Sequence, residues 1–190
     1  HFKAINDNFG HPAGDAVIRH VARLLGEHTR NCDTIGRLGG EEFIILLPET
    51  DLPQAQQTAE KLRGLIEHSA IDIENGRLQI TASIGLACLA PGCPTHLTPF
   101  YQAADQALYR AKRGGRNRVE VADGATASHG SNALAQRAAA AAFQLQAGER
   151  GFQRAALGLE AHGIDHRIDT AHARCLANDG IGRVVVLVEI

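Results

Sequence analysis

The chain has 190 residues and a formal net charge of −2, which favours one domain, or one domain with a small appendage. The near-neutral charge argues against nucleic-acid binding through a basic surface. No apolar run is long enough to span a bilayer, and the chain does not start with a signal-peptide pattern. The four cysteines show neither a CxxC pair nor a metal-binding spacing. We therefore expect a cytoplasmic domain with reduced thiols, with any membrane anchor lying upstream.

The first half of the chain predicts a helix followed by a β-hairpin. Residues 13–30 have helical spacing, and their shared face carries Val17, Val21, Leu24, Leu25 and His28. Residues 33–47 then change to a strand period around Gly39-Gly40. The run FIILL is apolar on both faces, which is typical of a central strand covered on both sides.

A second helix, a second hairpin and a third helix are predicted next. Pro48 ends the strand, Thr50 or Asp51 can cap the next helix, and its apolar stripe comprises Ala55, Ala59, Leu62, Leu65 and Ile66. Asn75-Gly76 predicts a turn between IDI and one long strand, RLQITASIGLACL. Thr98-Pro99 starts a helix that Gly114-Gly115 ends, and NRVEV is a closing strand. This alternation predicts a mixed α/β fold with a sheet covered by helices.

The character of the sequence changes after about residue 122, so we divide it into a domain at 1–122 and a linker, Ala-rich helix and tail of unknown function at 123–190. The tail contains His162, His166 and His172, which we interpret as surface histidines because no acid or cysteine completes a metal site. The final run RVVVLVEI looks like a strand without an obvious partner.

The stretch RLGGEEF places two glycines and two adjacent carboxylates directly before the most apolar strand. Gly39 and Gly40 allow a ligand to approach the backbone closely, because no Cβ is in the way. Glu41 and Glu42 repel one another, and a hard divalent cation would make their position at the edge of a core tolerable. The alternative is a hairpin tip with solvated acids.

Two further groups of residues suit a nucleotide. Asn6 and Asp15 have the donors and acceptors needed to read a guanine edge. Lys112 and Arg116 lie four residues apart around a helix end and suit phosphate oxygens. Each group also has an ordinary explanation, as a turn or as solvated charges at a helix C-terminus.

Taken together and in this order, the motifs FKAINDNFGH..GD, R..D five residues before GGEEF, ITASIG and AD.ALY.AK..GRNRV resemble the GGDEF family of diguanylate cyclases. The resemblance covers residues 1 to about 121. It implies a palm-like, ferredoxin-like nucleotidyl cyclase sheet covered by helices. It also implies condensation of two GTP molecules into cyclic di-GMP and two pyrophosphates, with two Mg²⁺ or Mn²⁺ ions per active site and a homodimer in which two such domains face each other.

The resemblance assigns roles to residues of this chain. Glu41 is a metal ligand, and Glu42 helps to deprotonate the attacking hydroxyl or holds the second metal. The substrate-binding residues are Phe2 and Lys3 (through backbone N–H groups), Asn6, Asp15, Arg37, Gly39, Gly40, Lys112 and Arg116. Arg30 and Asp33 match the family's RxxD inhibitory site for cyclic di-GMP, with Lys61 or Arg63 as candidates for a further cation.

The sequence departs from the family at its start. The family motif begins D-x-D-x-F-K, whereas this chain begins at His1, directly before Phe2. We therefore expect the first strand and its metal-binding Asp to be missing, the sheet to expose apolar surface, and catalysis by this fragment to be impaired. An upstream sensory or dimerising domain is also expected.

Two other functions remain open at this point. One is a catalytically silent GGDEF module that binds GTP or cyclic di-GMP as a receptor or scaffold. The other is a palm-type cyclase acting on one ATP, against which Asn6 and Asp15 argue as guanine readers.

Overall fold

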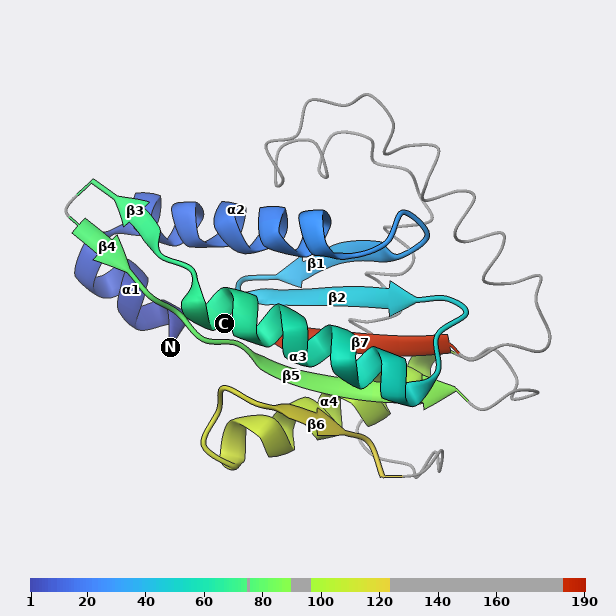
Figure 1. Ribbon diagram of the computed structural model, residues 1–190. Coiled ribbons are helices and arrows are strands. Elements are labelled where there is room, and N and C mark those ends of the chain that lie inside the picture. The colour runs from blue at the N-terminus through green and yellow to red at the C-terminus, as the bar shows by residue number, and fades with distance from the viewer. Residues whose placement is uncertain (75, 90–96, 124–182) are drawn as a thin grey trace.

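The computed structural model describes residues 1–74, 76–89, 97–123 and 183–190, and Figure 1 shows a main sheet with helices on both faces. The elements are α1 (Phe2–Phe9), α2 (His11–His28), β1 (Thr34–Gly39), β2 (Glu42–Leu47), α3 (Leu52–His68), β3 (Ile71–Ile73), β4 (Gly76–Leu78), β5 (Ser83–Leu89), α4 (Leu97–Arg113), β6 (Val119–Val121) and β7 (Arg183–Glu189). The main sheet has the order β1-β2-β7-β5-β6, and β3 and β4 form a separate pair. The mixed α/β class predicted from the sequence is confirmed.

The predicted Gly-Gly hairpin is present. β1 and β2 pair antiparallel, with a register shift between Arg37 and Gly39. Gly39 and Gly40 have φ values of 143° and 53°, in the region that favours glycine, so the pair sets the shape of the turn. In β2, Phe43, Ile45 and Leu47 are buried and alternate with half-buried residues, as expected of a covered strand.

The C-terminal strand corrects two expectations. The run RVVVLVEI does have partners: β7 lies between β2 and β5 and pairs antiparallel with both. Val184, Val185, Val186, Leu187 and Val188 are all at most 2% exposed. The central position of the sheet is thus filled from the end of the chain, and the apolar surface expected from a missing strand is covered. Apolar residues on both faces are what a central strand requires.

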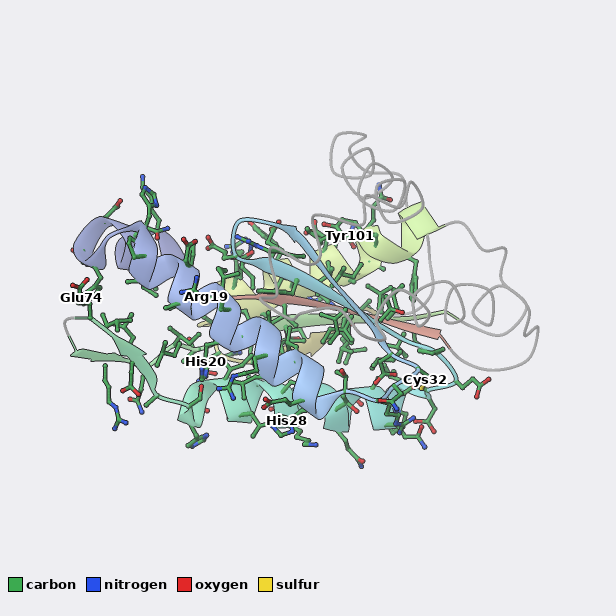
Figure 2. The ribbon with its side chains drawn as sticks, turned by 90° about the horizontal axis from the view of Figure 1, so that it is seen from above. Arg19, His20, His28, Cys32, Glu74 and Tyr101 are labelled. Carbon is green, nitrogen blue, oxygen red and sulfur yellow. The ribbon has the colours of Figure 1, made fainter. Side chains whose placement is uncertain are left out.

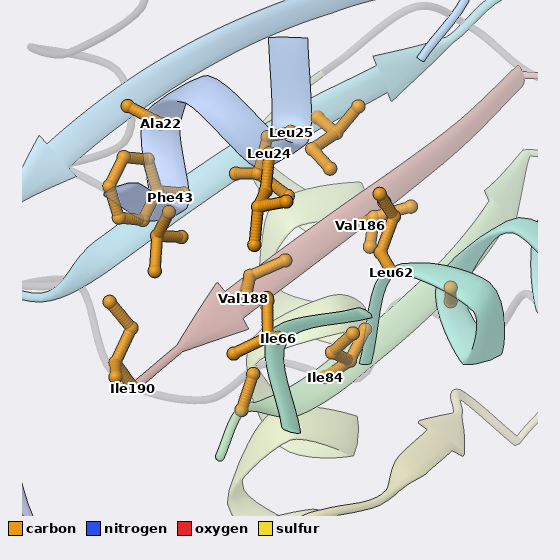
Figure 3. Close-up of a cluster of buried hydrophobic side chains, with 14 of the residues drawn as sticks. Ala22, Leu24, Leu25, Phe43, Leu62, Ile66, Ile84, Val186, Val188 and Ile190 are labelled. Atoms are coloured by element: carbon orange, nitrogen blue, oxygen red, sulfur yellow. The ribbon is translucent and has the colours of Figure 1, made fainter. Parts of the chain in front are cut away.

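Helices cover the two faces of β7 differently. Val184, Val186 and Val188 join the cluster formed by α2 and α3, whereas Val185 and Leu187 pack against α4. Figure 3 shows Val186 and Val188 beside Leu62 and Ile66 of α3. The helix predicted at 13–30 and the one predicted after Thr50 or Asp51 bury most of the expected stripes, including Val17 and Val21 of α2. His28 and Leu65, expected on these stripes, are half-buried.

The single long strand predicted after Asn75-Gly76 is wrong. β4 ends at Leu78 in the small hairpin with β3, and β5 starts at Ser83 in the main sheet. Ile80 and Ala82 are buried where the chain passes between the two sheets, so the alternating pattern continues although strand pairing does not. Residues 124–182, including the predicted Ala-rich helix and the three tail histidines, lie outside the described residues.

Candidate functional site

The tip of the β1–β2 hairpin is held in shape by Arg37. Its Nε and Nη2 atoms donate hydrogen bonds to the carbonyl oxygen of Gly40, at 3.0 and 2.6 Å. The turn therefore presents Glu41 and Glu42 at the start of β2 in a defined backbone conformation. In the described structure the Arg37 guanidinium binds the turn itself; the phosphate contact suggested for it stays a prediction.

The C-terminal strand brings a further carboxylate to this tip. Glu189 lies opposite Glu42 on one side and opposite Ser83 on the other. The Lys112 ammonium of α4 donates a hydrogen bond to Glu189 Oε2 at 2.7 Å. These two side chains are 31% and 18% exposed, so the ion pair is largely shielded from water. Three separate parts of the chain thus meet beside the hairpin tip.

Like charges act on Glu41. Burial is the main cause that raises the pKa of its carboxyl group, and the negative charge of Glu189 and then that of Glu42 raise it further. The pKa of Asp105, which lies seven residues before Lys112 on α4, is also raised. Burial is the main cause, Lys112 opposes it, and the charge of Glu189 adds to it. The N-terminal ammonium and Lys112 oppose the rise in the pKa of Glu41 without cancelling it. Carboxylates thus outnumber cations at the site, an environment that favours a bound cation.

The donor set suits the divalent ions that the resemblance implies. Carboxylate oxygens are the ligands that Mg²⁺ and Mn²⁺ prefer, and burial, followed by the charges of Glu189 and Glu42, raises the pKa of Glu41. Among the described residues, no three His, Cys, Asp or Glu side chains are gathered closely enough to form a ready metal site. The chemistry of the residues fits a cation, and binding one would require these side chains to converge.

The packing of α1 on α2 places one predicted guanine reader, Asn6, against the segment that carries the other, Asp15. Asn6 lies on α1, and its side chain packs so closely on Gly14 of α2 that a Cβ at that position would collide with the amide. Gly14 directly precedes Asp15, which is exposed on α2. The close approach therefore sets Asn6 beside the segment that carries Asp15.

The predicted phosphate-binding residues are not all in one place. Phe2 and Lys3 lie in the first turn of α1, where backbone N–H groups point out of the helix. Lys112 is in the last turn of α4 and contacts Glu189. Arg116 follows that helix, is exposed and has φ 61°. Lys112 thus joins the carboxylates, and Arg116 lies on the loop beyond them.

A second candidate site lies at the other end of α2. The backbone N–H of Arg30 donates to Asp33 Oδ2 at 2.6 Å, and the N–H of Asp33 donates to the Arg30 carbonyl at 3.0 Å. A pocket of about 240 Å³ is lined by His28, Arg30, Asp33, Leu47, Thr50, Thr58 and Lys61. Figure 2 shows His28 and Cys32 at this end of α2. Burial raises the pKa of Asp33, and the N–H of Arg30 partly offsets this.

Of the two candidates for a further cation near this pocket, Lys61 lines it and Arg63 does not. Arg63 instead donates to Glu60, Glu67 and the Asn117 side chain, at 2.7 to 2.8 Å. The bond to Asn117 ties α3 to the loop after α4.

Sequence reasoning missed Glu189 and Asp105. Asp105 is seven residues before Lys112, and this helical spacing could have placed both on one face. Glu189 had no such signal, because its position depends on pairing between strands far apart in the chain.

Among the described helices, none is long and apolar enough to cross a membrane.

The chain matches known proteins over the part that contains these sites. The family model described as "Diguanylate cyclase, GGDEF domain" matches residues 1–118. Diguanylate cyclase DgcP of Pseudomonas aeruginosa is 45% identical over 122 residues, covering 64% of this chain and 18% of the relative. Diguanylate cyclase A of Treponema denticola is 40% identical over 120 residues, covering 63% and 32%. The chain thus spans less than a third of the length of either relative.

Solved structures agree with the sequence matches. The GGDEF domain of DgcB from Caulobacter crescentus, in complex with c-di-GMP, aligns with a TM-score of 0.60 at 38% identity, covering 65% of this chain and 73% of that one. The active GGEEF domain of a diguanylate cyclase from Vibrio cholerae aligns with a TM-score of 0.56 at 36% identity, covering 65% and 77%.

Proposed function

The chain belongs to the GGDEF family of diguanylate cyclases, and we propose that it joins two GTP molecules into cyclic di-GMP and releases two pyrophosphates. The observation that carries the proposal is the hairpin tip. Glu41 and Glu42 lie there beside Glu189, with the ammonium of Lys112 2.7 Å from the Glu189 carboxylate. Acidic groups for cations and a basic group for phosphate are the parts that phosphoryl transfer needs at one place.

The proposed reaction forms one P–O bond and breaks another, twice. The 3′-oxygen of one GTP attacks the α-phosphorus of the other; the bond from that phosphorus to the bridging oxygen of the β-phosphate breaks, and pyrophosphate leaves. The 3′-hydroxyl proton passes to a base, for which Glu42 is the candidate. When bound, the divalent ions neutralise phosphate charge; Glu41, and in the alternative role Glu42, would hold them.

Substrate selection and positioning use the other residues. Asn6 and Asp15 would hydrogen-bond the guanine edge, since Asp accepts and Asn both donates and accepts. Lys112 and Arg116 would bind phosphate oxygens, together with the N–H groups of the first turn of α1 near Phe2 and Lys3. Each domain holds one GTP, so the chemistry requires two copies of the domain to face each other.

Product inhibition is proposed at the pocket at the end of α2. The guanidinium of Arg30 suits phosphate, and the Asp33 carboxylate suits a guanine edge. Lys61 lines the same pocket, so we propose Lys61 rather than Arg63 as the further cation of this site. The GGDEF domain of DgcB from Caulobacter crescentus has been solved with c-di-GMP, which supports cyclic di-GMP as the ligand class.

The full chain incubated with GTP and Mg²⁺ tests the proposal, with the nucleotides separated by chromatography. We expect cyclic di-GMP and pyrophosphate in a ratio of one to two. Glu41→Ala should abolish both, whereas Glu74→Ala, which removes an exposed carboxylate in the remote β3–β4 hairpin, should not. Absence of product with retained binding of cyclic di-GMP, lost on Arg30→Ala, would instead identify a receptor module without turnover.

A further inference from the structure

β7 is the one strand of the main sheet that reaches its place from a distant part of the sequence. The other four strands lie between Thr34 and Val121, and β7 starts at Arg183. It nevertheless pairs along its whole length, with six register pairs to β2 and seven to β5. Figure 1 shows this strand, in red, between β2 and β5. The hairpin that carries Glu41 and Glu42 therefore rests on a strand that the chain supplies last.

Glu189, at the end of β7, connects groups that the rest of the chain leaves apart. It is opposite Glu42 in the sheet and accepts the hydrogen bond of the Lys112 ammonium from α4. It is 18% exposed, so its charge is poorly screened by water. A carboxylate in this position has two effects: it fixes where the Lys112 ammonium lies, and it adds negative charge next to Glu41.

We propose that the C-terminal strand completes the nucleotide site, with Glu189 as a positioning residue that holds Lys112 beside the carboxylates until Mg²⁺-bound triphosphate replaces it. This inference rests on the proposed function for its ligand, a metal-bound nucleoside triphosphate. Phosphate oxygens are anionic acceptors like the Glu189 carboxylate, so they can take over the Lys112 ammonium. The metal that arrives with them supplies the positive charge that Glu189 then needs.

The ordinary alternative is a hydrophobic strand whose last side chain makes an incidental ion pair. A strand with five buried apolar residues needs no acid to hold it, and the cost of removing two charges from water can offset the attraction between them. This alternative predicts that removing the charge of Glu189 leaves nucleotide binding unchanged. The two interpretations thus differ in ligand binding rather than in stability.

The position of β7 can be tested without any ligand. Val184 lies directly opposite Cys88 of β5, so Val184→Cys places two thiols at facing positions of neighbouring strands. In a background with Cys32, Cys93 and Cys175 replaced by Ser, mild oxidation should form the Cys88 disulfide in the monomer. The matched control is Val185→Cys, which faces Ala87 and points to the other side of the sheet. Equal cross-linking of both variants, or of neither, would overturn the placement of β7.

The role of Glu189 is tested with Glu189→Gln and Glu189→Asp in the full chain, with Glu120→Gln on β6 as the matched control. We expect Glu189→Gln to weaken binding of Mg²⁺-GTP by about tenfold or more, because the cation loses a neighbouring carboxylate charge and this loss outweighs the release of Lys112. KM should rise more than kcat falls. Glu189→Asp should restore part of the affinity, because it keeps the charge. Wild-type affinity in Glu189→Gln would overturn the proposal.

The cross-link separates failure of this inference from failure of the proposed function. If the wild type binds no GTP, the proposed function fails, while the cross-link still decides whether β7 lies between β2 and β5, where Glu189 is opposite Glu42.

Discussion

The Lys112 ammonium and the Glu189 carboxylate lie 2.7 Å apart although 77 positions separate them in the sequence. Their contact joins the end of α4 to the end of β7, at the sheet position next to Glu42. The site therefore draws on the start of the chain, the Gly-Gly hairpin, α4 and the C-terminal strand. The sheet position expected to be empty is filled by β7, and its Glu189 brings an acid next to Glu42.

Arg30→Ala should release the protein from product inhibition. The turn that holds Asp33 uses the backbone N–H and carbonyl of residue 30, which alanine keeps, so the loop should retain its shape. Loss of the guanidinium should weaken cyclic di-GMP binding by about tenfold or more, measured by calorimetry. Initial rates with GTP should be unchanged, and added cyclic di-GMP should no longer lower them.

Two other variants test whether the effect of Arg30→Ala is specific to the pocket. Lys61→Ala, in the same pocket, should also weaken cyclic di-GMP binding, whereas Arg23→Ala removes an exposed cation of α2 that pairs with Glu27 and should not. Arg30→Ala protein that is still inhibited to the same degree would place the inhibitory site elsewhere.

The pH dependence of stability should reveal Glu41. Its pKa is raised in the folded protein, so the folded chain holds this proton more tightly than the unfolded chain does. As pH rises from the ordinary glutamate range through the higher pKa of the folded state, the free energy of unfolding should fall. Glu41→Gln removes this cost, so it should be more stable than the wild type at neutral pH. The difference should shrink as the pH is lowered.

Paired thermal melts of the two proteins from pH 4 to pH 8 measure this difference. Mg²⁺ should raise the melting temperature of the wild type and not that of Glu41→Gln, because the cation stabilises the charged carboxylate. A stability difference that grows toward acid pH would contradict the raised pKa.

Local sequence signals predicted most of the elements correctly. Gly39-Gly40, Asp51 and Gly114-Gly115 mark a turn, a helix start and a helix end, and each acts through its own backbone geometry or a bond to a near neighbour. The apolar stripes of α2 and α3 also follow from spacing alone. These features depend on residues only a few positions apart, so their spacing can be read directly from the sequence.

The part that the sequence did not reveal depends on distant pairing. An apolar run such as RVVVLVEI indicates a buried strand, but the strands with which it pairs depend on the arrangement of the whole sheet. Glu189 could therefore not be placed beside Lys112, and the long strand after Gly76 could not be divided between two sheets. The choice between Lys61 and Arg63 likewise depended on which way each side chain of α3 points.

Gly85→Ala should destabilise the fold and disturb the site through α4. A Cβ on Gly85 of β5 would collide with the backbone of α4, at the Ala104 carbonyl and at Leu108. Backbone cannot move aside as a flexible side chain can, so α4 would have to shift, at a cost of about 1–3 kcal/mol. Chemical denaturation measures the loss. Gly64→Ala in α3 is the control: no atom lies within 4 Å of its added Cβ, and it should stabilise the helix. Equal effects at the two positions would show that the close packing of α4 on β5 is not what Gly85 provides.

Asp51→Ala should lower stability without affecting nucleotide chemistry. The Asp51 side chain caps α3 by accepting a hydrogen bond from the Gln54 N–H at 2.8 Å. Loss of such a cap typically costs about 1 kcal/mol, since an N–H of the first turn loses its partner. Asp51→Asn keeps an acceptor oxygen and should recover most of the loss, which separates the hydrogen bond from the charge. Denaturation midpoints of the three proteins decide this, with GTP turnover measured well below the transition. Lys61 of α3 lines the pocket with Arg30, so cyclic di-GMP binding should weaken only if the start of α3 frays in the variant. A loss of GTP turnover in folded Asp51→Ala would contradict this prediction and show that the two sites are coupled through α3.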